Sequence, residues 1–247
     1  MAYKKIAKSI AAVFAAGATG ILIALVSIAI GSTNVRADEH QDEADRDLAA
    51  IGLRIAPDFI NTNGKNLTLV GLGSFIVNAQ ADCNGCHGSD PANEFLPKNN
   101  PYFRPPNNAP VKYNQATYLN GGQNFGPVGP GIANGVVGAG PDIISRNLTP
   151  DHTGNPEGGN DLDTFVTIIR TGHDFDHLHP NCGKGVTDNC YFAPVNGNVL
   201  QVMPWPKYQH MTDHQLKAIW TYLSTVPCNA HNDALGMKYP WLKNQCE

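Results

Sequence analysis

Apolar residues recur at the spacing of an amphipathic helix in four stretches of the chain. The third stretch is the clearest, because Leu162, Phe165 and Ile169 fall on one face and Gly172 follows as a stop signal. The pattern predicts helices over residues 42–55, 67–78, 161–171 and 212–226.

Residues that can cap a helix precede two of these stretches. Asn66 can accept backbone N–H groups of the second helix, and Thr212 with Gln215 has the spacing of a capping box. Gly71 and Gly73 each lower helix propensity by roughly 1 kcal/mol relative to alanine. We therefore expect them at a close crossing of two helices.

Regular periodicity is nearly lost over residues 91–160, where prolines and glycines punctuate the chain. The chain has 25 glycines and 18 prolines and only 15% charged residues, which is typical of a scaffold with long irregular loops. We expect few strands. The predicted fold is mainly α, with residues 91–160 as a loop insertion.

One pentapeptide, Cys83-Asn84-Gly85-Cys86-His87, carries the chemistry. In this pattern two thiols one helical turn apart can form thioethers with a haem, and the histidine can ligate its iron. A redox dithiol or half a zinc site is the alternative, but the adjacent histidine and the lack of a second such pair weaken both. We predict one covalently attached haem c.

The sixth position on the iron decides between electron transfer and chemistry at the iron. Met203 is our candidate, because we expect Pro204 and Pro206 to keep its segment extended. Met211 competes for the same role. Three histidines could instead give bis-histidine ligation: His173, His210 and His214.

Four further residues are candidates for cofactor contacts. Trp205 and Tyr208 are predicted to pack on the haem, with a polar tip near a propionate. Arg146 and Arg170 could bind propionates, because a guanidinium can grip a carboxylate with two hydrogen bonds.

The first 37 residues (1–37) have the pattern of an export signal. Lys4, Lys5 and Lys8 precede an apolar run over residues 10–30. The run is longer than the usual signal core of about 7–15 residues and approaches the roughly 20 that span a bilayer. A cleaved signal peptide and a membrane anchor both remain open, and either one predicts a periplasmic or extracytoplasmic protein.

The four remaining cysteines fit an oxidising compartment if they pair. Of the three possible connectivities, the sequential one closes two short loops, Cys182–Cys190 and Cys228–Cys246. Each bridge would contribute about 2–3 kcal/mol.

The charge of the exported part excludes a nucleic-acid partner. Four of the 17 basic residues lie in the predicted leader, residues 1–37. The exported part therefore has 13 basic and 21 acidic residues, a net charge of −8. A redox partner with a basic rim would suit this surface.

Five further motifs lie on either side of the pentapeptide, in a fixed order along the chain. They lie at residues 71–77, 146–151, 170–172, 203–206 and 211–213. In sequence and order they resemble those of exported bacterial class I c-type cytochromes, especially the cytochrome subunits of membrane-linked dehydrogenases.

The resemblance covers roughly residues 48–227 and implies a class I cytochrome c-like helical fold wrapped around one haem, ligated by His87 and Met203. The predicted parts are a helical extension (38–60), the cytochrome domain (61–227) and a disulfide-tied tail (228–247). The long insertion, the Cys182–Cys190 segment and the tail depart from the family pattern and put the partner in doubt.

Two smaller clusters could bind metal. Residues 173–179 alternate histidine and aspartate, which supply imidazole and carboxylate ligands, although such a run is more often a solvated loop. Oxygen ligands suitable for Ca²⁺ lie in a glycine-rich loop without the spacing of a known calcium loop, at Asp151, Asn155, Glu157 and Asp161.

The sequence predicts an electron carrier rather than an enzyme. Its expected partners are redox proteins, a dehydrogenase or a terminal oxidase. Two alternatives stay open: a haem enzyme or gas sensor with a labile distal ligand, and a relay subunit of a larger respiratory or dehydrogenase complex.

Overall fold

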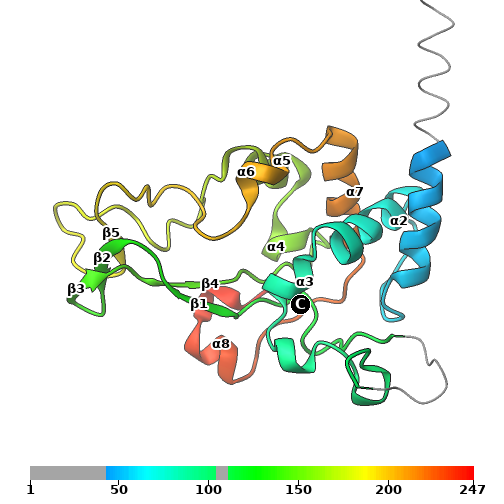
Figure 1. Cartoon of the computed structure of the whole chain (residues 1–247), viewed down its shortest axis with the longest axis horizontal. Coiled ribbons are helices and arrows are strands. Elements are labelled where there is room, and N and C mark those ends of the chain that lie inside the picture. Colours follow the sequence, from blue (N-terminus) through cyan, green and yellow to red (C-terminus); the bar gives the residue numbers. More distant parts are fainter. Residues whose placement is uncertain (1–42, 104–110) are drawn as a thin grey trace, which may run out of the picture. The chain divides into compact units, whose positions relative to one another are not determined.

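Two crossed helices, α2 (Leu67–Phe75) and α7 (Asp213–Leu223), hold the core of the chain (Figure 1). A Cβ atom on Gly73 would lie 2.0 Å from the carbonyl oxygen of Ala218 in α7, and one on Gly71 would lie 2.3 Å from that of Ala49. Only glycine permits both approaches. The expectation that these two glycines mark a close crossing is confirmed.

This computed structural model describes residues 43–103 and 111–247. The predicted leader, residues 1–37, lies outside the described residues, whether it is a cleaved signal peptide or a membrane anchor. No helix in the described part of the chain is long and apolar enough to span a bilayer. The first described helix covers residues 43–55, as the sequence pattern predicts, and buries Ala49 in the core.

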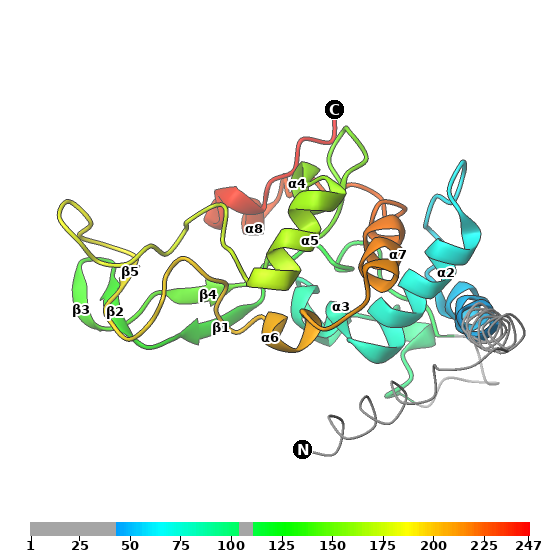
Figure 2. The ribbon, with the colours of Figure 1, turned by 90° about the horizontal axis from the view of Figure 1, so that it is seen from above.

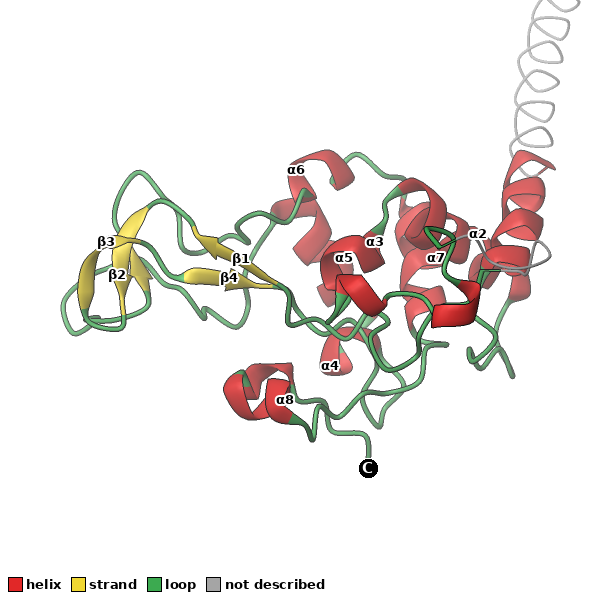
Figure 3. Cartoon of the chain, turned by 60° about the horizontal axis from the view of Figure 1, so that its bottom comes forward, coloured by secondary structure: helices red, strands yellow, loops and turns green. Residues whose placement is uncertain are grey.

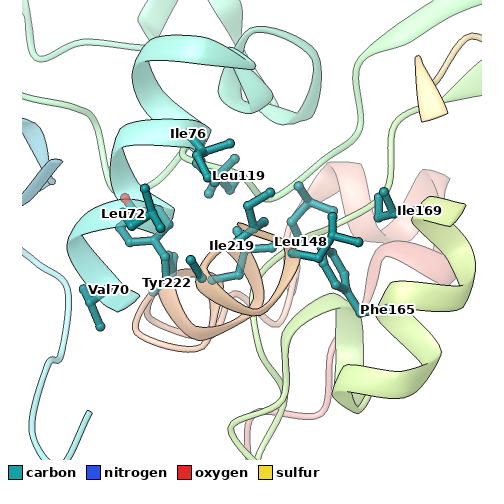
Figure 4. Packing of buried hydrophobic residues seen from close by; sticks show 14 of the residues in the cluster. Val70, Leu72, Ile76, Leu119, Leu148, Phe165, Ile169, Ile219 and Tyr222 are labelled. Atoms are coloured by element: carbon teal, nitrogen blue, oxygen red, sulfur yellow. The ribbon is translucent and has the colours of Figure 1, made fainter. Parts of the chain in front are cut away.

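Buried side chains from α2, α7 and α5 (Leu162–Thr171) form one continuous core, which Figure 4 shows from close by. Leu72 comes from α2, Ile219 and Tyr222 come from α7, and Phe165 comes from α5. Leu119 and other loop residues complete the cluster.

The helix ends agree with the capping signals in the sequence. The side chain of Asn66 accepts from the backbone N–H of Thr68 at 3.0 Å and of Leu69 at 3.2 Å. Thr212 and Gln215 form the predicted capping box at the start of α7. Short elements complete the helical part: η1 (Ile76–Gln80), α3 (Cys83–His87), η2 (Pro91–Asn93), η3 (Pro97–Asn99), α4 (Pro156–Gly159), α6 (Trp205–Tyr208), α8 (Ala234–Lys238) and η5 (Pro240–Leu242).

The expectation of a mainly α, class I cytochrome c-like fold is wrong, because strands form two small antiparallel sheets. One pairs β1 (Asn124–Pro127) with β4 (Asp142–Ile144), and the other has the order β3 (Val136–Ala139), β2 (Pro130–Ala133), β5 (Cys190–Tyr191). Figure 3 shows these strands gathered away from α2 and α7. The chain is mixed α and β, and most of its strands lie in the stretch expected to be irregular.

A two-residue turn explains the β2–β3 hairpin. Asn134 and Gly135 both have positive φ angles, 52° and 75°, and Ala133 pairs directly with Val136 across them. Asn-Gly is the preferred sequence for such a turn, because both residues tolerate the left-handed region. The many neighbouring glycines and prolines hid this signal in the sequence.

Both disulfides follow the sequential connectivity. Cys182–Cys190 closes a loop beside β5, and Cys228–Cys246 ties the C-terminal tail to the end of the α7 segment. The tail is therefore held by a covalent link as well as by contacts.

Candidate cofactor site

The chain reaches the Cys-x-x-Cys-His motif through an abrupt change of backbone direction. Helix α2 continues as the π-helical turn η1, in which the N–H of Ala81 donates to the carbonyl of Ile76 at 2.8 Å. Asp82 then takes a left-handed conformation, with φ of 47°, and α3 begins at Cys83. In Figure 2, α3 is seen with α5, α6 and α7 around it.

The two residues between the cysteines have structural roles. Gly85 accommodates the Asp82 carboxylate, which accepts from its N–H at 3.3 Å, because a Cβ there would lie 2.5 Å from that carboxylate. Asn84 accepts from the N–H of Leu119 at 2.8 Å and donates to Glu94 at 3.0 Å. These contacts fix α3 against the loop beyond it.

Cys83 and Cys86 are not bonded to each other, whereas the other four cysteines are paired. Burial raises the pKa of Cys83 to about 12, and burial together with Asp82 also raises the pKa of Cys86. A redox dithiol needs a thiolate, which a lowered pKa supplies. The pair is therefore poorly suited to disulfide exchange.

His87 is buried and oriented by the backbone. Its Nδ1 lies 2.8 Å from the carbonyl oxygen of Arg146 and donates to it, which leaves the lone pair on Nε2. Burial lowers the pKa of His87, so the imidazole is neutral at pH 7. A neutral, oriented imidazole is the state that ligates a metal.

A largely apolar cavity opens beside α3. Cys83, Cys86, His87 and Met203 all line it. Helices α5 and α7 supply six apolar side chains of its wall, and loops and β4 supply others. The six are Phe165, Ile168, Ile169, Leu216, Ile219 and Leu223. The site therefore combines two free thiols, an imidazole and a thioether in one largely apolar chamber. Helix α2 contributes no lining residue and supports α7 from behind.

Met203 reaches the cavity from a strained turn rather than from an extended segment. Its N–H donates to the carbonyl of Gln201 at 2.7 Å, and Val202 between them has a φ of 68°. This conformation is unfavourable for a β-branched residue. The predicted extended conformation of residues 202–206 is wrong, because Met203 lies in this turn and α6 begins at Trp205. Pro204 is the N-cap of α6 and Pro206 lies in its first turn, where a missing N–H group is not needed.

The candidate distal ligands divide into two groups. Met211 lines the cavity together with Met203. The three histidines that could give bis-histidine ligation are absent from the lining: His173, His210 and His214. A different histidine, His179, does line it.

Of the predicted cofactor contacts, Tyr208 and Arg146 lie on the cavity, whereas Trp205 and Arg170 do not. Tyr208 donates to the carbonyl of Ala81 at 3.1 Å. Trp205 instead donates to the carbonyl of Leu200 at 3.1 Å.

Neither arginine has a free guanidinium. Arg146 is paired with Asp174 at 2.6 Å and also with Asp176. Arg170 bonds the carbonyl of Gln209 and pairs with Asp213 at 2.7 Å, which joins α5 to the start of α7. Through its carbonyl, Arg146 positions His87 instead.

The two suggested metal clusters are not assembled. Within residues 43–103 and 111–247, no group of three or more His, Cys, Asp or Glu side chains is placed to hold a metal ion. Asp161 caps α5 through the N–H of Thr164 at 2.8 Å, and Asp174 pairs with Arg146.

Several polar residues of the cavity were not among the predicted cofactor contacts, and the pKa is shifted in three of them: Glu157, His179 and Tyr191. Burial raises the pKa of Glu157, lowers that of His179 and raises that of Tyr191 to about 12. Tyr191 is therefore protonated at pH 7. Two sequence features lie near the last two: His179 ends the histidine and aspartate run over residues 173–179, and Cys182 and Cys190 lie between His179 and Tyr191.

Comparisons of the chain with protein-family models, with curated proteins and with solved structures found no match. Function is therefore inferred from the residues and geometry of this site.

Proposed function

We propose that the chain is an exported haem c protein that transfers single electrons between redox partner proteins. One haem would be attached to Cys83 and Cys86, with His87 and Met203 as axial ligands. When bound, the haem supplies a one-electron couple at its iron. The observation that carries the proposal is the meeting of these four side chains on one largely apolar cavity.

The geometry of α3 suits covalent attachment. Cys83 and Cys86 stand one turn apart, remain unpaired and face the cavity that His87 also lines. The capping contact from Asp82 to Gly85 holds this turn closed. The chain thereby presents both thiols to one ligand in a fixed orientation.

The surroundings of the two ligand candidates favour electron transfer. The Arg146 carbonyl keeps His87 in one tautomer, which strengthens the imidazole as a ligand. The thioether of Met203 is a soft ligand that favours reduced iron. The apolar side chains of α5 and α7 exclude water, which keeps the environment similar in both redox states.

The disulfides support an oxidising compartment for the protein, in keeping with the export signal predicted from residues 1–37. The proposed protein would thus act outside the cytoplasmic membrane, either released or anchored through residues 10–30.

A haem sensor or enzyme with a labile distal ligand is the second candidate. It is favoured by the strained turn beside Met203, where Val202 has a φ of 68°, because strained backbone of this kind clusters at switch segments.

The test is expression of the full chain in a bacterium that attaches haem c, followed by haem staining of a denaturing gel. Wild-type protein is expected to retain haem, and a variant with Cys83→Ala and Cys86→Ala to lose it. A variant with Cys182→Ala and Cys190→Ala is the matched control and should retain haem. Absence of covalent haem from the wild type would refute the proposal.

Spectra of the loaded protein separate the two candidates. An electron carrier should show the near-infrared sulfur-to-iron band when oxidised and bind no CO when reduced. Met203→Ala should remove the band and admit CO. Rapid CO binding by the wild type would favour the sensor or enzyme instead.

A further inference from the structure

Glu157 brings a carboxylate into the cavity without a cation to balance it. Arg146 is the one lysine or arginine in the described lining of the cavity, and Asp174 and Asp176 occupy both ends of its guanidinium. No ion pair in the described part of the chain involves Glu157. Its side-chain partner is a neutral amide, because its Oε2 accepts from Asn160 Nδ2 at 3.1 Å. In a largely apolar cavity, an unpaired carboxylate is costly in its charged form.

The backbone at Glu157 is strained and is held in place by hydrogen bonds. Glu157 has a φ of 52°, in the left-handed region that a residue with a Cβ atom rarely adopts. Its N–H donates to the carbonyl of Leu148 at 3.3 Å, and the N–H of Gly158 donates to that of Thr149 at 3.2 Å. Glycine adopts such a conformation without strain, as Gly158 does at a φ of 71°. A glutamate held there points to a role for its carboxylate.

We propose that Glu157 binds one proton when the protein accepts one electron, so that electron transfer is coupled to proton uptake. This proposal rests on the proposed haem site. The electron comes from a redox partner protein and the proton comes from solvent. The proton forms an O–H bond on a carboxylate oxygen of Glu157, and no other bond forms or breaks. Oxidation passes the electron to the acceptor and returns the proton to solvent.

Electrostatic repulsion couples the two events. Reduction adds one negative charge to the cavity, and a nearby negative charge makes a carboxylate hold its proton more tightly. Burial is the main reason for the raised pKa of Cys83, and the charge of Glu157 adds to it. The carboxylate is therefore within electrostatic reach of the proposed attachment point. In largely apolar surroundings this interaction is weakened less than in water.

The coupling makes the reduction potential depend on pH. Burial raises the pKa of Glu157 above its ordinary value of 4.5, against the smaller effects of the Asn160 hydrogen bond and the Arg146 charge. The pKa is higher in the reduced protein than in the oxidised protein. Between these two pKa values the potential falls as the pH rises, by at most about 59 mV per pH unit for one proton and one electron. Outside them this contribution is constant.

Other groups around Glu157 supply a background that the experiment must separate. Trp220 of α7 donates to the carbonyl of Asn160, and Asn244 of the tail lies beside Gly158, but neither of these side chains titrates. The cysteines do not titrate as thioethers, and the carboxylates of the haem do titrate. Asp151 and Asp161 flank Glu157 along its own segment, while Asp82, Arg146, Asp174 and His179 line the cavity with it.

Reduction potentials of the haem-loaded full chain, measured from about pH 4 to about pH 9, test the proposal. Glu157→Gln keeps the shape of the side chain and an acceptor for Asn160 but cannot bind the proton. We expect the wild-type potential to fall as Glu157 loses its proton. The potential of Glu157→Gln should lack this fall, so that it equals that of the wild type at low pH and exceeds it at high pH.

Infrared difference spectra between the two redox states give a second readout. The C=O band of a protonated carboxyl group should appear when the wild type is reduced and should be absent from Glu157→Gln. Glu157→Gly is the second variant, because glycine adopts a φ of 52° without strain. It should show the same loss of the band and of the pH dependence, so the result does not depend on the folding of the glutamine variant.

Asp163→Asn is the matched control. Asp163 follows in the same segment, but it is exposed and does not line the cavity. Its replacement removes the same charge in water and should leave the band and the pH dependence unchanged. His179→Asn removes the histidine of the cavity lining that is not a proposed ligand, and it should leave the carboxyl band in place.

The outcomes separate this proposal from the proposed function. A wild-type protein without covalent haem would overturn both. A haem-loaded wild type whose potential does not change with pH in this range, or changes to the same extent in Glu157→Gln, would overturn the proton coupling alone.

Discussion

Replacing Gly73 by alanine tests whether α2 and α7 cross as closely as the structure shows. The new Cβ would lie 2.0 Å from the Ala218 carbonyl oxygen and 2.6 Å from both the Ala218 carbonyl carbon and the Tyr222 Cβ. Two of these atoms belong to the backbone, so a rotamer change cannot relieve the overlap. The helices must move apart.

Two opposing effects set the size of the change. Alanine gains about 1 kcal/mol over glycine in helix propensity, while overpacking a core costs about 1–3 kcal/mol and occasionally more. With contacts this short we take the upper end, which gives a net loss of about 2 kcal/mol in the free energy of unfolding. A loss of that size lowers the melting temperature of a chain this long by about 4–8 °C.

Urea unfolding followed by circular dichroism measures the effect. Gly183→Ala is the matched control, because no atom lies within 4 Å of its added Cβ. Helix propensity alone predicts that Gly73→Ala is more stable than the wild type. A variant as stable as the wild type, or more so, would refute the close crossing.

Three further changes test other parts of the structure. Asn66→Ala removes the cap of α2 and should lower the free energy of unfolding by about 1 kcal/mol in urea, whereas Asn66→Asp should be nearly neutral. Replacing Cys228 and Cys246 by serine should cost about 3 kcal/mol, measured without reductant, and equal stability of the variant would contradict the role of the bridge. The hydrogen bonds from Thr164 lower the pKa of Asp161, so its stabilisation is present above its unfolded pKa, near 4, and is lost as the pH falls through its lower folded pKa. Asp161→Asn should reduce this loss of stability, measured as the free energy of unfolding between pH 2 and pH 5. An unchanged pH dependence would show that the Asp161 cap contributes nothing to it.

Local signals in the sequence determined the helices and the motif. Side chains such as Asn66 and Thr212 act on backbone groups two or three residues away, so their effect can be predicted without the fold. The spacing of Cys83, Cys86 and His87 is likewise a property of one helical turn. The short loops of the two disulfides could be predicted for the same reason.

The strands were partly predictable from the sequence, although the composition of residues 91–160 predicts an irregular loop. Asn134-Gly135 between apolar residues is a hairpin signal, but the surrounding glycines and prolines favoured an irregular loop. The partner β5 comes from residues 190–191, far along the chain, and no local pattern predicts that pairing.

The composition of the cavity depended on tertiary structure alone. Arg146 and Arg170 have the same chemistry in sequence, yet one lines the cavity with its charge already paired and the other joins two helices. His179 and Tyr191 also line the cavity, where a disulfide closes the loop between them and β5 pairs Tyr191 with Gly131. The sequence by itself determined that Cys83, Cys86 and His87 lie together on α3, because that spacing is a property of one turn of helix. Only the tertiary structure decided which distant side chains share their cavity, because that depends on contacts between segments far apart in the chain.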